Sequence, residues 1–429
     1  MLGAVCYLNS MWGVFQFDDY KVIVEYEGVH SWQAWVDGLG HGIRPVLKLS
    51  YMLNWVSGWG PRGFHLVNIS IHLANAWLVY RLAQEFVANQ PQEGRLQEVP
   101  LLVALLFVAH PIHTEAVTYI SGRSSSLMTL FYLAAVLVYA RARHRHSAWH
   151  LALLVPTLFV TALAVKETAV TLPPALLLWE FACGGNWRTA LRRQWPCWSV
   201  LLVAGVFFLL NDSYFEHMRL SAESNSLSGN VAVQLSGLVH LLRQWLMPVA
   251  LNIDPDLSTS SNFTGMAVPL LLAFVVVVCM FRLVRARPWI SFALAWVLLH
   301  TIALHLLLPR LDVANERQML LAGWPLLLAL VIELTLWLRP GVVRVLVVFL
   351  VLVLAGLTVL RNQVYISEIA LWQDTVAKSP QKARVHNNLG YAYVLANQRE
   401  AARREFARAL QLDPHDLKAR GNLRRLDEP

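Results

Sequence analysis

Residues 342–360 read VVRVLVVFLVLVLAGLTVL, an apolar run interrupted by a single charged side chain, Arg344. One helical span needs roughly 20 apolar residues to cross a bilayer core, and about eleven segments approach this length. The others are residues 1–15, 64–84, 99–110, 127–142, 149–165, 168–181, 197–210, 266–284, 289–308 and 318–338. The sequence therefore predicts an all-α, polytopic membrane protein. The first segment is short for a span, so we expect that it tilts, that the bilayer thins around it, or that the chain starts inside a longer segment.

The composition indicates the same class. The chain has 429 residues, of which 56% are hydrophobic and only 14% charged, whereas soluble domains carry about 25% charged residues. The net charge of +8 does not indicate nucleic acid binding, because the basic residues gather in short loops between apolar segments. The four cysteines lie in or beside apolar segments without a CxxC pair, so we predict neither a disulfide framework nor a zinc site.

Loops rich in Lys and Arg set the orientation. These loops are residues 141–145, 188–193, 282–287 and 339–344, and the positive-inside rule places them in the cytoplasm. The N-terminus is then inside, and residues 364–429 are outside. The other polar loops fall on the outer side, namely residues 16–63, 110–126, 165–168, 211–265 and 309–317. Most motif-like residues lie in these loops, which predicts a functional site on the outer side.

Two outer loops are expected to contain helices that lie on the membrane. The first outer loop, residues 16–63, carries Trp32, Trp35 and Trp55 among polar residues, and such rings prefer headgroup depth. Residues 231–249, in the second large outer loop, are apolar enough to be mistaken for a span. The number of crossings instead favours a re-entrant or membrane-surface segment there.

Residues 382–414, KARVHNNLGYAYVLANQREAARREFARALQLDP, have the spacing of a tetratricopeptide repeat, whose period is about 34 residues. The matching positions are Asn388, Leu389, Gly390, Tyr391, Ala401, Phe406, Ala409, Leu410 and Pro414. The turn between the two helices departs from the pattern, because Ala396-Asn397 replaces the usual small turn residue. An array of fewer than about three repeats is marginal alone, so we expect residues 364–429 to pack on the membrane domain or on a partner.

Residues 15–20, FQFDDY, open the first outer loop with two adjacent carboxylates, Asp18 and Asp19. One interpretation is a solvated acidic turn at the end of a span. The other is catalytic, because a carboxylate at the membrane surface can deprotonate an acceptor hydroxyl as it attacks a sugar. We favour Asp18 as the base, with Asp19 orienting the acceptor or supporting its neighbour.

Residues 110–115, HPIHTE, form the next polar motif, and Arg123 follows in Ser121-Gly122-Arg123. His110, His113 and Glu115 do not fit a standard zinc spacing, and Pro111 breaks the helix that would align them. We therefore expect these residues to hydrogen-bond a polar substrate, or else to cap the end of a span. No metal ligand is predicted, and the cofactor is left open.

Charged side chains recur at two further outer turns. Lys166-Glu167 interrupts two apolar segments, and ionisable residues near membrane depth are candidates for function. Lys166 can neutralise a phosphate, although a purely structural ion pair is the alternative. Asn315-Glu316-Arg317 opens a later span, and the guanidinium of Arg317 can offer forked donors to a lipid phosphate. The alternative for Arg317 is an anchor at the interface or an ion pair with Glu316.

Two other sets of polar residues are interpreted as mainly structural. His65, Asn68, His72 and Asn75 share one face of the second span, and a polar stripe in lipid must face protein. We expect His72 and Asn75 to hold the bundle together, whereas His65 lies near the outer end and is a candidate for the site. Residues 252–256, NIDPD, are interpreted as an Asx-Pro turn.

The motifs FDDY, FHLVNISIHLANA, HPIHTEAVTYISGRS, AVKETAVTLP, LNIDPD and NER occur in this order before the repeat-like unit. Together they resemble the transmembrane and tetratricopeptide-repeat family of O-mannosyltransferases and its bacterial relatives, over nearly the whole chain. The resemblance implies a GT-C type membrane fold for residues 1–363 and an acidic catalytic residue in the first outer loop. It also implies a polyprenyl-phosphate sugar as donor and repeats on the same side as the site.

Carried over residue by residue, the resemblance makes Asp18 or Asp19 the base. It implies that His113 and Glu115 contact the acceptor or the sugar. Lys166 and Arg317 would hold the donor phosphate.

The chain departs from the family pattern in three places. Ser125 stands where relatives often have an acidic residue, and Gln318-Met319-Leu320 replaces an aromatic segment. The repeat array is also short. These departures bear on the substrate, on activity and on the protein partner.

We predict an inverting glycosyltransferase of the bacterial inner membrane. It would move a mannose-like sugar from polyprenyl phosphate to a hydroxyl of an exported protein, with the repeat-like tail on the periplasmic side. The alternative is a non-catalytic membrane scaffold that docks an envelope or secretion partner through its repeat, and Ser125 favours it. A transporter ranks lowest, because the polar residues gather in outer loops and no paired broken helices are visible. Adjacent carboxylates are also not the flanking pair of a glycoside hydrolase.

Overall fold

The computed structural model describes residues 2–40, 43–91, 93–145, 147–210, 227–257, 263–303 and 314–427. Helices make up almost all of these residues, and no strand occurs among them, which confirms the predicted all-α class. Parts of the second large outer loop and of loop 309–317, namely residues 211–226, 258–262 and 309–313, lie outside the described residues.

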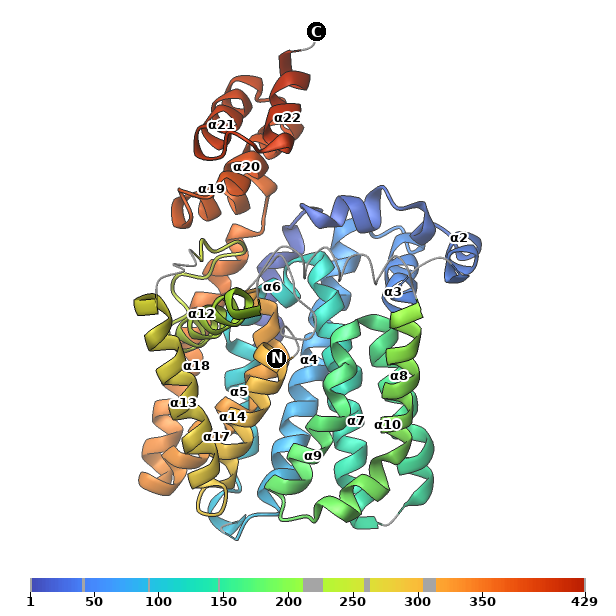
Figure 1. Cartoon of the computed structure of the whole chain (residues 1–429), viewed down its shortest axis with the longest axis vertical. Helices are drawn as coiled ribbons and strands as arrows, with labels where there is room; N and C mark the ends of the chain where they lie inside the picture. Colours follow the sequence, from blue (N-terminus) through green and yellow to red (C-terminus); the bar gives the residue numbers. More distant parts are fainter. Residues whose placement is uncertain are drawn as a thin grey trace.

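Long helices lie side by side in one bundle, and a smaller helical unit projects from one end of it (Figure 1). The central helix α4 packs against both α5 and α7. The bundle consists of α4 (Gly60–Val87), α5 (Val99–Ala109), α7 (Arg123–Arg145), α8 (Val155–Val165), α9 (Leu172–Ala182), α10 (Trp187–Leu210), α13 (Phe263–Leu283), α14 (Pro288–Leu298), α17 (Trp324–Trp337) and α18 (Pro340–Val364).

Two helical stretches of the described residues, Ile120–Arg145 and Pro340–Val364, are long and apolar enough to cross a membrane. The number rises to four if two bent pairs, with bends of 54° and 57°, each form one span. The predicted count of about eleven is therefore not confirmed, because several apolar helices, such as α8 and α14, have only 11 residues. The outward face of α18 is apolar, with Val345 72% exposed, which fits a helix covered by lipid rather than water.

One end of the bundle, which we call the capped end, is covered by short helices and turns and by the longer helix α12 (Leu227–Leu246) (Figure 1). The short elements are α2 (Trp32–Asp37), α3 (Pro45–Val56), α6 (Thr114–Val117), η9 (Glu167–Thr171), η11 (Glu316–Gln318) and α16 (Met319–Ala322). The helix α12 lies across the bundle (Figure 1), and the predicted re-entrant or membrane-surface position of residues 231–249 stays a prediction. The turns between α9 and α10, α13 and α14, and α17 and α18 lie at the opposite end. The polar loops and the basic loops therefore lie at opposite ends of the bundle, and the orientation in a membrane stays a prediction.

The first apolar segment does not run the length of the bundle. The helix α1 (Leu2–Tyr7) has six residues, and the 3-10 turn η1 (Leu8–Trp12) follows it. Gly3 faces Leu73, in the middle of α4, and Val108. Residues 1–15 are expected to form a span. The structure instead has a short helix there, which lies inside the bundle and leads to the capped end.

The polar face of α4 holds the turn between α6 and α7 and the start of α7 in place. The side-chain amide of Asn68 donates to the carbonyls of Val117 and Ile120 at 3.1 and 3.2 Å. Arg123 Nε in turn donates to Asn68 Oδ1 at 2.6 Å. Asn75 donates to the carbonyl of Ser126 at 2.9 Å. These buried bonds fix the turn between α6 and α7, on which the site described below is built.

The C-terminal unit consists of α19 (Glu368–Lys378), α20 (Ala383–Leu395), α21 (Arg399–Leu412) and α22 (Leu417–Asp427). A Cβ on Gly390 would meet the ring of Phe406 at 2.6 Å, so the glycine permits the close packing of α20 on α21. Asn397 adopts φ 57° in the turn between them. Asparagine tolerates this left-handed conformation, which explains why the unusual Ala396-Asn397 turn closes. The assignment of the pair as a tetratricopeptide repeat stays a prediction.

Asp254 attaches the C-terminal unit to the capped end. Its carboxylate accepts from Lys382 Nζ at 2.6 Å and from Arg384 Nε at 2.8 Å. Ser379 Oγ donates to the Asp254 carbonyl at 3.0 Å and accepts from Asn252 Nδ2 at 2.8 Å. The NIDPD segment is therefore more than the Asx-Pro turn expected from sequence, since it forms the interface with this unit.

Replacing Asp254 with Ala should loosen the C-terminal unit. The buried carboxylate neutralises two cations that are themselves partly exposed, so we expect a loss of roughly 1–3 kcal/mol of docking free energy. Limited trypsin digestion of the purified protein should then release residues beyond 368 several times faster. Asp256→Ala, at the exposed neighbouring carboxylate, is the matched control. Equal digestion rates for the wild type and the Asp254 variant would contradict this role.

Candidate active site

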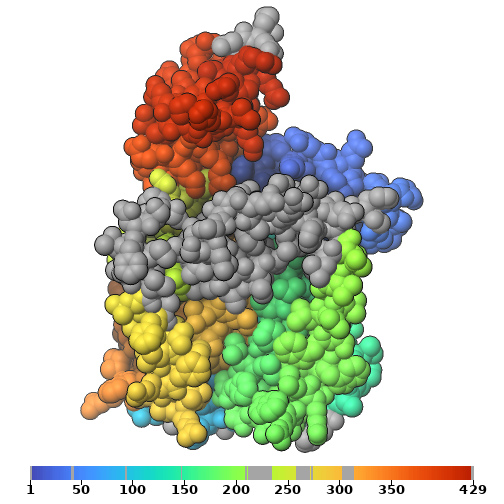
Figure 2. Space-filling model, in the orientation of Figure 1, coloured from blue at the N-terminus to red at the C-terminus, as the bar shows by residue number. Residues whose placement is uncertain are grey.

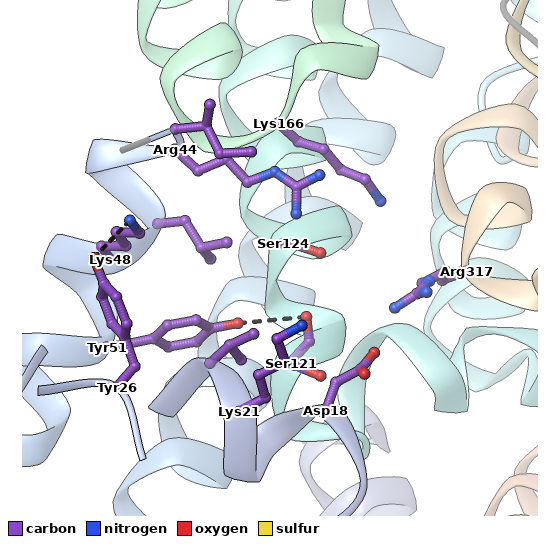
Figure 3. A pocket seen from close by; sticks show the side chains of 13 residues that line it. Asp18, Lys21, Tyr26, Arg44, Lys48, Tyr51, Ser121, Ser124, Lys166 and Arg317 are labelled. Atoms are coloured by element: carbon purple, nitrogen blue, oxygen red, sulfur yellow. Dashed lines mark hydrogen bonds between the residues drawn. The ribbon is translucent and has the colours of Figure 1, made fainter. Parts of the chain in front are cut away.

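A cavity of about 380 Å³ opens at the capped end (Figure 3). Its charged lining contains five cationic side chains and one carboxylate, so it favours an anionic ligand. Residues from the first loop, the α6–α7 turn, the end of α8 and η11 meet there. The lining residues are Asp18, Lys21, Val22, Tyr26, Ile43, Arg44, Leu47, Lys48, Tyr51, Ser121, Ser124, Lys166 and Arg317.

The two adjacent aspartates point in different directions. Asp18 lines the cavity, and its backbone N–H donates to the hydroxyl of Tyr119 at 3.0 Å. Asp19 is fully buried, and its carboxylate accepts from the backbone N–H groups of Gln16 at 3.0 Å and Ser121 at 2.8 Å. Asp19 therefore ties the first loop to the α6–α7 turn, whereas Asp18 lines the cavity.

Burial raises the pKa of Asp19 from 3.8 to about 7. Desolvation of the charged form is the largest cause, and the negative charge of Asp18 acts in the same direction. The hydrogen bonds from Gln16 and Ser121 oppose the shift, because they stabilise the carboxylate. Asp19 thus titrates near neutral pH.

Lys166 lies at the end of α8, where the backbone leaves the helix in an extended conformation with φ −158°. Its Nζ donates to Ser125 Oγ at 2.7 Å. Figure 3 shows its ammonium group pointing into the space that Asp18 and Arg317 also face. Ser125, the residue that departs from the family pattern, is therefore a direct partner of a cation in the cavity.

Arg317 is the one residue of Asn315-Glu316-Arg317 that lines the cavity. The Arg317 backbone N–H donates to Glu115 Oε2 at 3.0 Å, and its Nε lies 3.4 Å from Glu115 Oε1. Glu316 is buried and faces Arg361 at 3.9 Å, while Asn315 is buried at the start of η11. Glu115 thus orients Arg317 from beneath the cavity instead of lining it.

Three cationic or aromatic side chains of α3 and its preceding turn were not singled out from the sequence. Arg44, Lys48 and Tyr51 line the cavity. Arg44 directly precedes α3, and Lys48 and Tyr51, spaced i and i+3, lie on one face of this helix. This spacing is the signal that sequence reasoning missed. Arg44 adopts φ 63° before Pro45, and its guanidinium binds both oxygens of Glu167 at 2.9 Å.

Four predicted site residues are directed elsewhere. His65 faces the carbonyl of Gly13 at 3.3 Å, His110 that of Trp245 at 3.1 Å, and His113 that of Phe107 at 2.9 Å. Arg123 is buried and donates to the carbonyl of Phe64 at 3.0 Å. These side chains satisfy backbone carbonyls, so they support the site without lining its cavity. No cluster of three or more metal-ligating side chains occurs among the described residues.

A second, apolar groove of about 570 Å³ adjoins the cavity. Ile43 and Arg44 line both spaces, and the Arg44–Glu167 ion pair stands between them. The remaining walls come mostly from α8 and α10, with Leu39 and Pro45 from the first loop, and are almost entirely aliphatic or aromatic. They comprise Leu39, Pro45, Val160, Leu163, Ala164, Ser199, Val200, Val203, Ala204 and Phe207.

The structure thus combines apolar helices, of which at least two are long enough to cross a membrane, with a largely cationic cavity beside an apolar groove. A protein O-mannosyl-transferase of Caenorhabditis elegans is 25% identical over 451 residues, covering 96% of this chain and 62% of that protein. Tmtc2 of Drosophila melanogaster, also a protein O-mannosyl-transferase, is 34% identical over 231 residues, covering 49% of this chain and 24% of that protein. For human TMTC3 the identity is 28% over 192 residues, covering 41% of this chain and 20% of that protein.

These similarities confirm the resemblance that the ordered motifs indicate. The chain spans less than two thirds of the length of each of these relatives. No family model matches the chain, and no solved structure matches it.

The raised pKa of Asp19 predicts a pH-dependent stability. Between pH 3.8 and about 7 the folded protein keeps a proton that the unfolded chain releases, so stability should fall as pH rises through this window and level off above it. Asp19→Asn removes the titration and should flatten this part of the curve. Thermal unfolding in detergent at pH 4.5, 6 and 7.5 measures the slope. Asp37→Asn, at an exposed carboxylate, is the control, and an unchanged slope in the Asp19 variant would contradict the assignment.

Proposed function

We propose that the protein is a glycosyltransferase that moves a mannose-like sugar from a polyprenyl-phosphate donor to a hydroxyl group of a protein. The observation that carries this proposal is the cavity, which combines one carboxylate, Asp18, with five cations and opens beside an apolar groove. The printed names of the relatives, protein O-mannosyl-transferases, give the reaction class.

The reaction is a single displacement at the anomeric carbon. The acceptor oxygen attacks this carbon while Asp18 takes the hydroxyl proton. The bond between the anomeric carbon and the phosphate oxygen breaks, and the polyprenyl phosphate leaves with the electron pair. Lys166 and Arg317 stabilise its charge, and they are already oriented by Ser125 and Glu115. Attack opposite the leaving group inverts the anomeric configuration.

The groove supports a lipid-linked donor. A polyprenyl chain needs a long apolar surface, and the walls contributed by α8 and α10 supply one next to the cations. Arg44, which lines both spaces, is then at the level of the phosphate. A free nucleotide sugar would leave this groove without a role.

Topology completes the proposal. A GT-C type arrangement with about eleven spans would place the capped end outside, at the periplasmic face of a bacterial inner membrane. The C-terminal unit and the first loop rise from the same end of the molecule (Figure 2). An exported protein held by that unit is therefore close to the cavity.

The alternative of a non-catalytic scaffold requires no common cavity. A scaffold would place no constraint on the positions of Asp18, Lys166 and Arg317, whereas in the structure all three line one cavity. The geometry therefore favours the transferase, and Ser125 is explained as the hydroxyl that receives a hydrogen bond from Lys166.

Asp18→Asn should lower the rate of sugar transfer by roughly 100- to 10,000-fold, because it removes the proposed base. Asp19→Asn should act more weakly, since Asp19 holds the loop. The assay is mannose transfer from polyprenyl-phosphate mannose to a Ser- and Thr-rich peptide in proteoliposomes. The control is Asp37→Asn in the same loop. Full activity in the Asp18 variant would exclude Asp18 as the base.

Ala204→Phe fills the groove and should raise the KM for a donor with a long polyprenyl chain by about tenfold, which corresponds to about 1.4 kcal/mol of binding. A donor with a short chain does not fill the groove and should be little affected. Leu202→Phe, on the exposed side of α10, is the matched control. The same KM change for both donors would place the lipid elsewhere.

A further inference from the structure

The first helix of the C-terminal unit, α19, contacts the segment that carries Asp18. The ring of Phe17 packs edge-on against Trp372 of α19, with centroids 5.1 Å apart. Phe17 has φ 47°, a conformation that costs a non-glycine residue about 1–2 kcal/mol. Such a backbone persists only where its surroundings hold it, and Trp372 supplies one of these contacts.

The residues on either side of Phe17 are held as well. The side-chain amide of Gln16 donates to the carbonyl of Tyr365, which ends α18 just before α19. On the other side, the Asp18 N–H donates to Tyr119. The direction of the Asp18 carboxylate is therefore set by a short peptide fixed between the α6–α7 turn and the base of the C-terminal unit.

The same helix also reaches the other side of the cavity. Asp374 of α19 binds Arg361 at 2.7 Å, and Arg361 lies 3.9 Å from Glu316. Glu316 also accepts from the backbone N–H of Asn252 and directly precedes Arg317, which lines the cavity. A shift of α19 would therefore move the elements that carry both Asp18 and Arg317.

We propose that α19 is a positioning element of the active site, and that Trp372 orients Asp18 through Phe17. The C-terminal unit then has two roles, since it is a docking module and also part of the support of the catalytic carboxylate. A protein segment that displaces α19 on binding would alter the geometry at Asp18. The inference that this contact affects catalysis rests on the proposed function. The contact itself is observed in the structure and does not depend on that proposal.

Trp372 also belongs to the apolar core of the C-terminal unit, with Val385 and Leu389. A variant at this position can therefore act through the stability of that unit. Phe406 separates the two effects, because it packs in the core of α20, α21 and α22 and is not part of the contact with Phe17. Trp372→Phe keeps an aromatic ring on Phe17 and serves as the rescue variant.

The experiment uses the full chain in detergent or proteoliposomes and has two measurements. Hydrogen exchange at the backbone amides of residues 17–20 reports the loop without requiring activity. Steady-state transfer reports kcat and the KM for polyprenyl-phosphate mannose. Trp372→Ala should accelerate exchange at residues 17–20 and lower kcat roughly 10- to 100-fold, as expected for a small misplacement of the base, with the donor KM within about twofold. Trp372→Phe should recover most of both.

Phe406→Ala should leave exchange at residues 17–20 and kcat near the wild-type values. The inference is overturned if Trp372→Ala accelerates exchange only within residues 368–427, or if Phe406→Ala lowers kcat to the same extent. If the wild type transfers no sugar from a polyprenyl phosphate, the proposed function fails, and the exchange measurement still decides whether Trp372 holds the loop.

Discussion

The two hydrogen bonds to the buried carboxylate of Asp19 are the constraint on which the site depends. They join the backbone of Gln16 to that of Ser121 across about a hundred positions of sequence. Together with the bond from the Asp18 N–H to the Tyr119 hydroxyl, this connection fixes the first loop over the α6–α7 turn, which forms one wall of the cavity. Burial disfavours the charged form of the carboxylate and raises its pKa to about 7. The two N–H donors reduce this desolvation penalty.

The surroundings of the cavity are arranged to keep its cations oriented. Glu115 holds Arg317, Glu167 holds Arg44, and Ser125 accepts from Lys166. Two carboxylates thus balance part of the positive charge from outside the cavity, while Asp18 is the one acidic side chain among the described residues that lines it. An anionic leaving group would therefore meet groups that need little reorganisation.

The C-terminal unit is attached to the elements that form the cavity. Asp254 fixes it to the capped end through Lys382 and Arg384, and α19 continues directly from α18 to reach Phe17. This helix contacts the elements that carry Asp18 and those that carry Arg317. Because packed interfaces move as units, a partner that binds the far side of the helix can shift both sets of elements. This gives a physical reason for one chain to contain both parts.

The sequence by itself determined the helical class and the gathering of polar motifs at one end, and it predicted as site residues Asp18, Lys166 and Arg317, which line one cavity. The periodicity and composition of the sequence are enough to predict these features, because they show which segments can lie in lipid and which must lie in water. Only the tertiary structure decided which aspartate faces the cavity, that His65, His110 and His113 bind backbone carbonyls, and that Arg44 and Trp372 take part. The direction of a side chain depends on partners far away in sequence, and no local pattern records a contact such as that between Asp19 and Ser121.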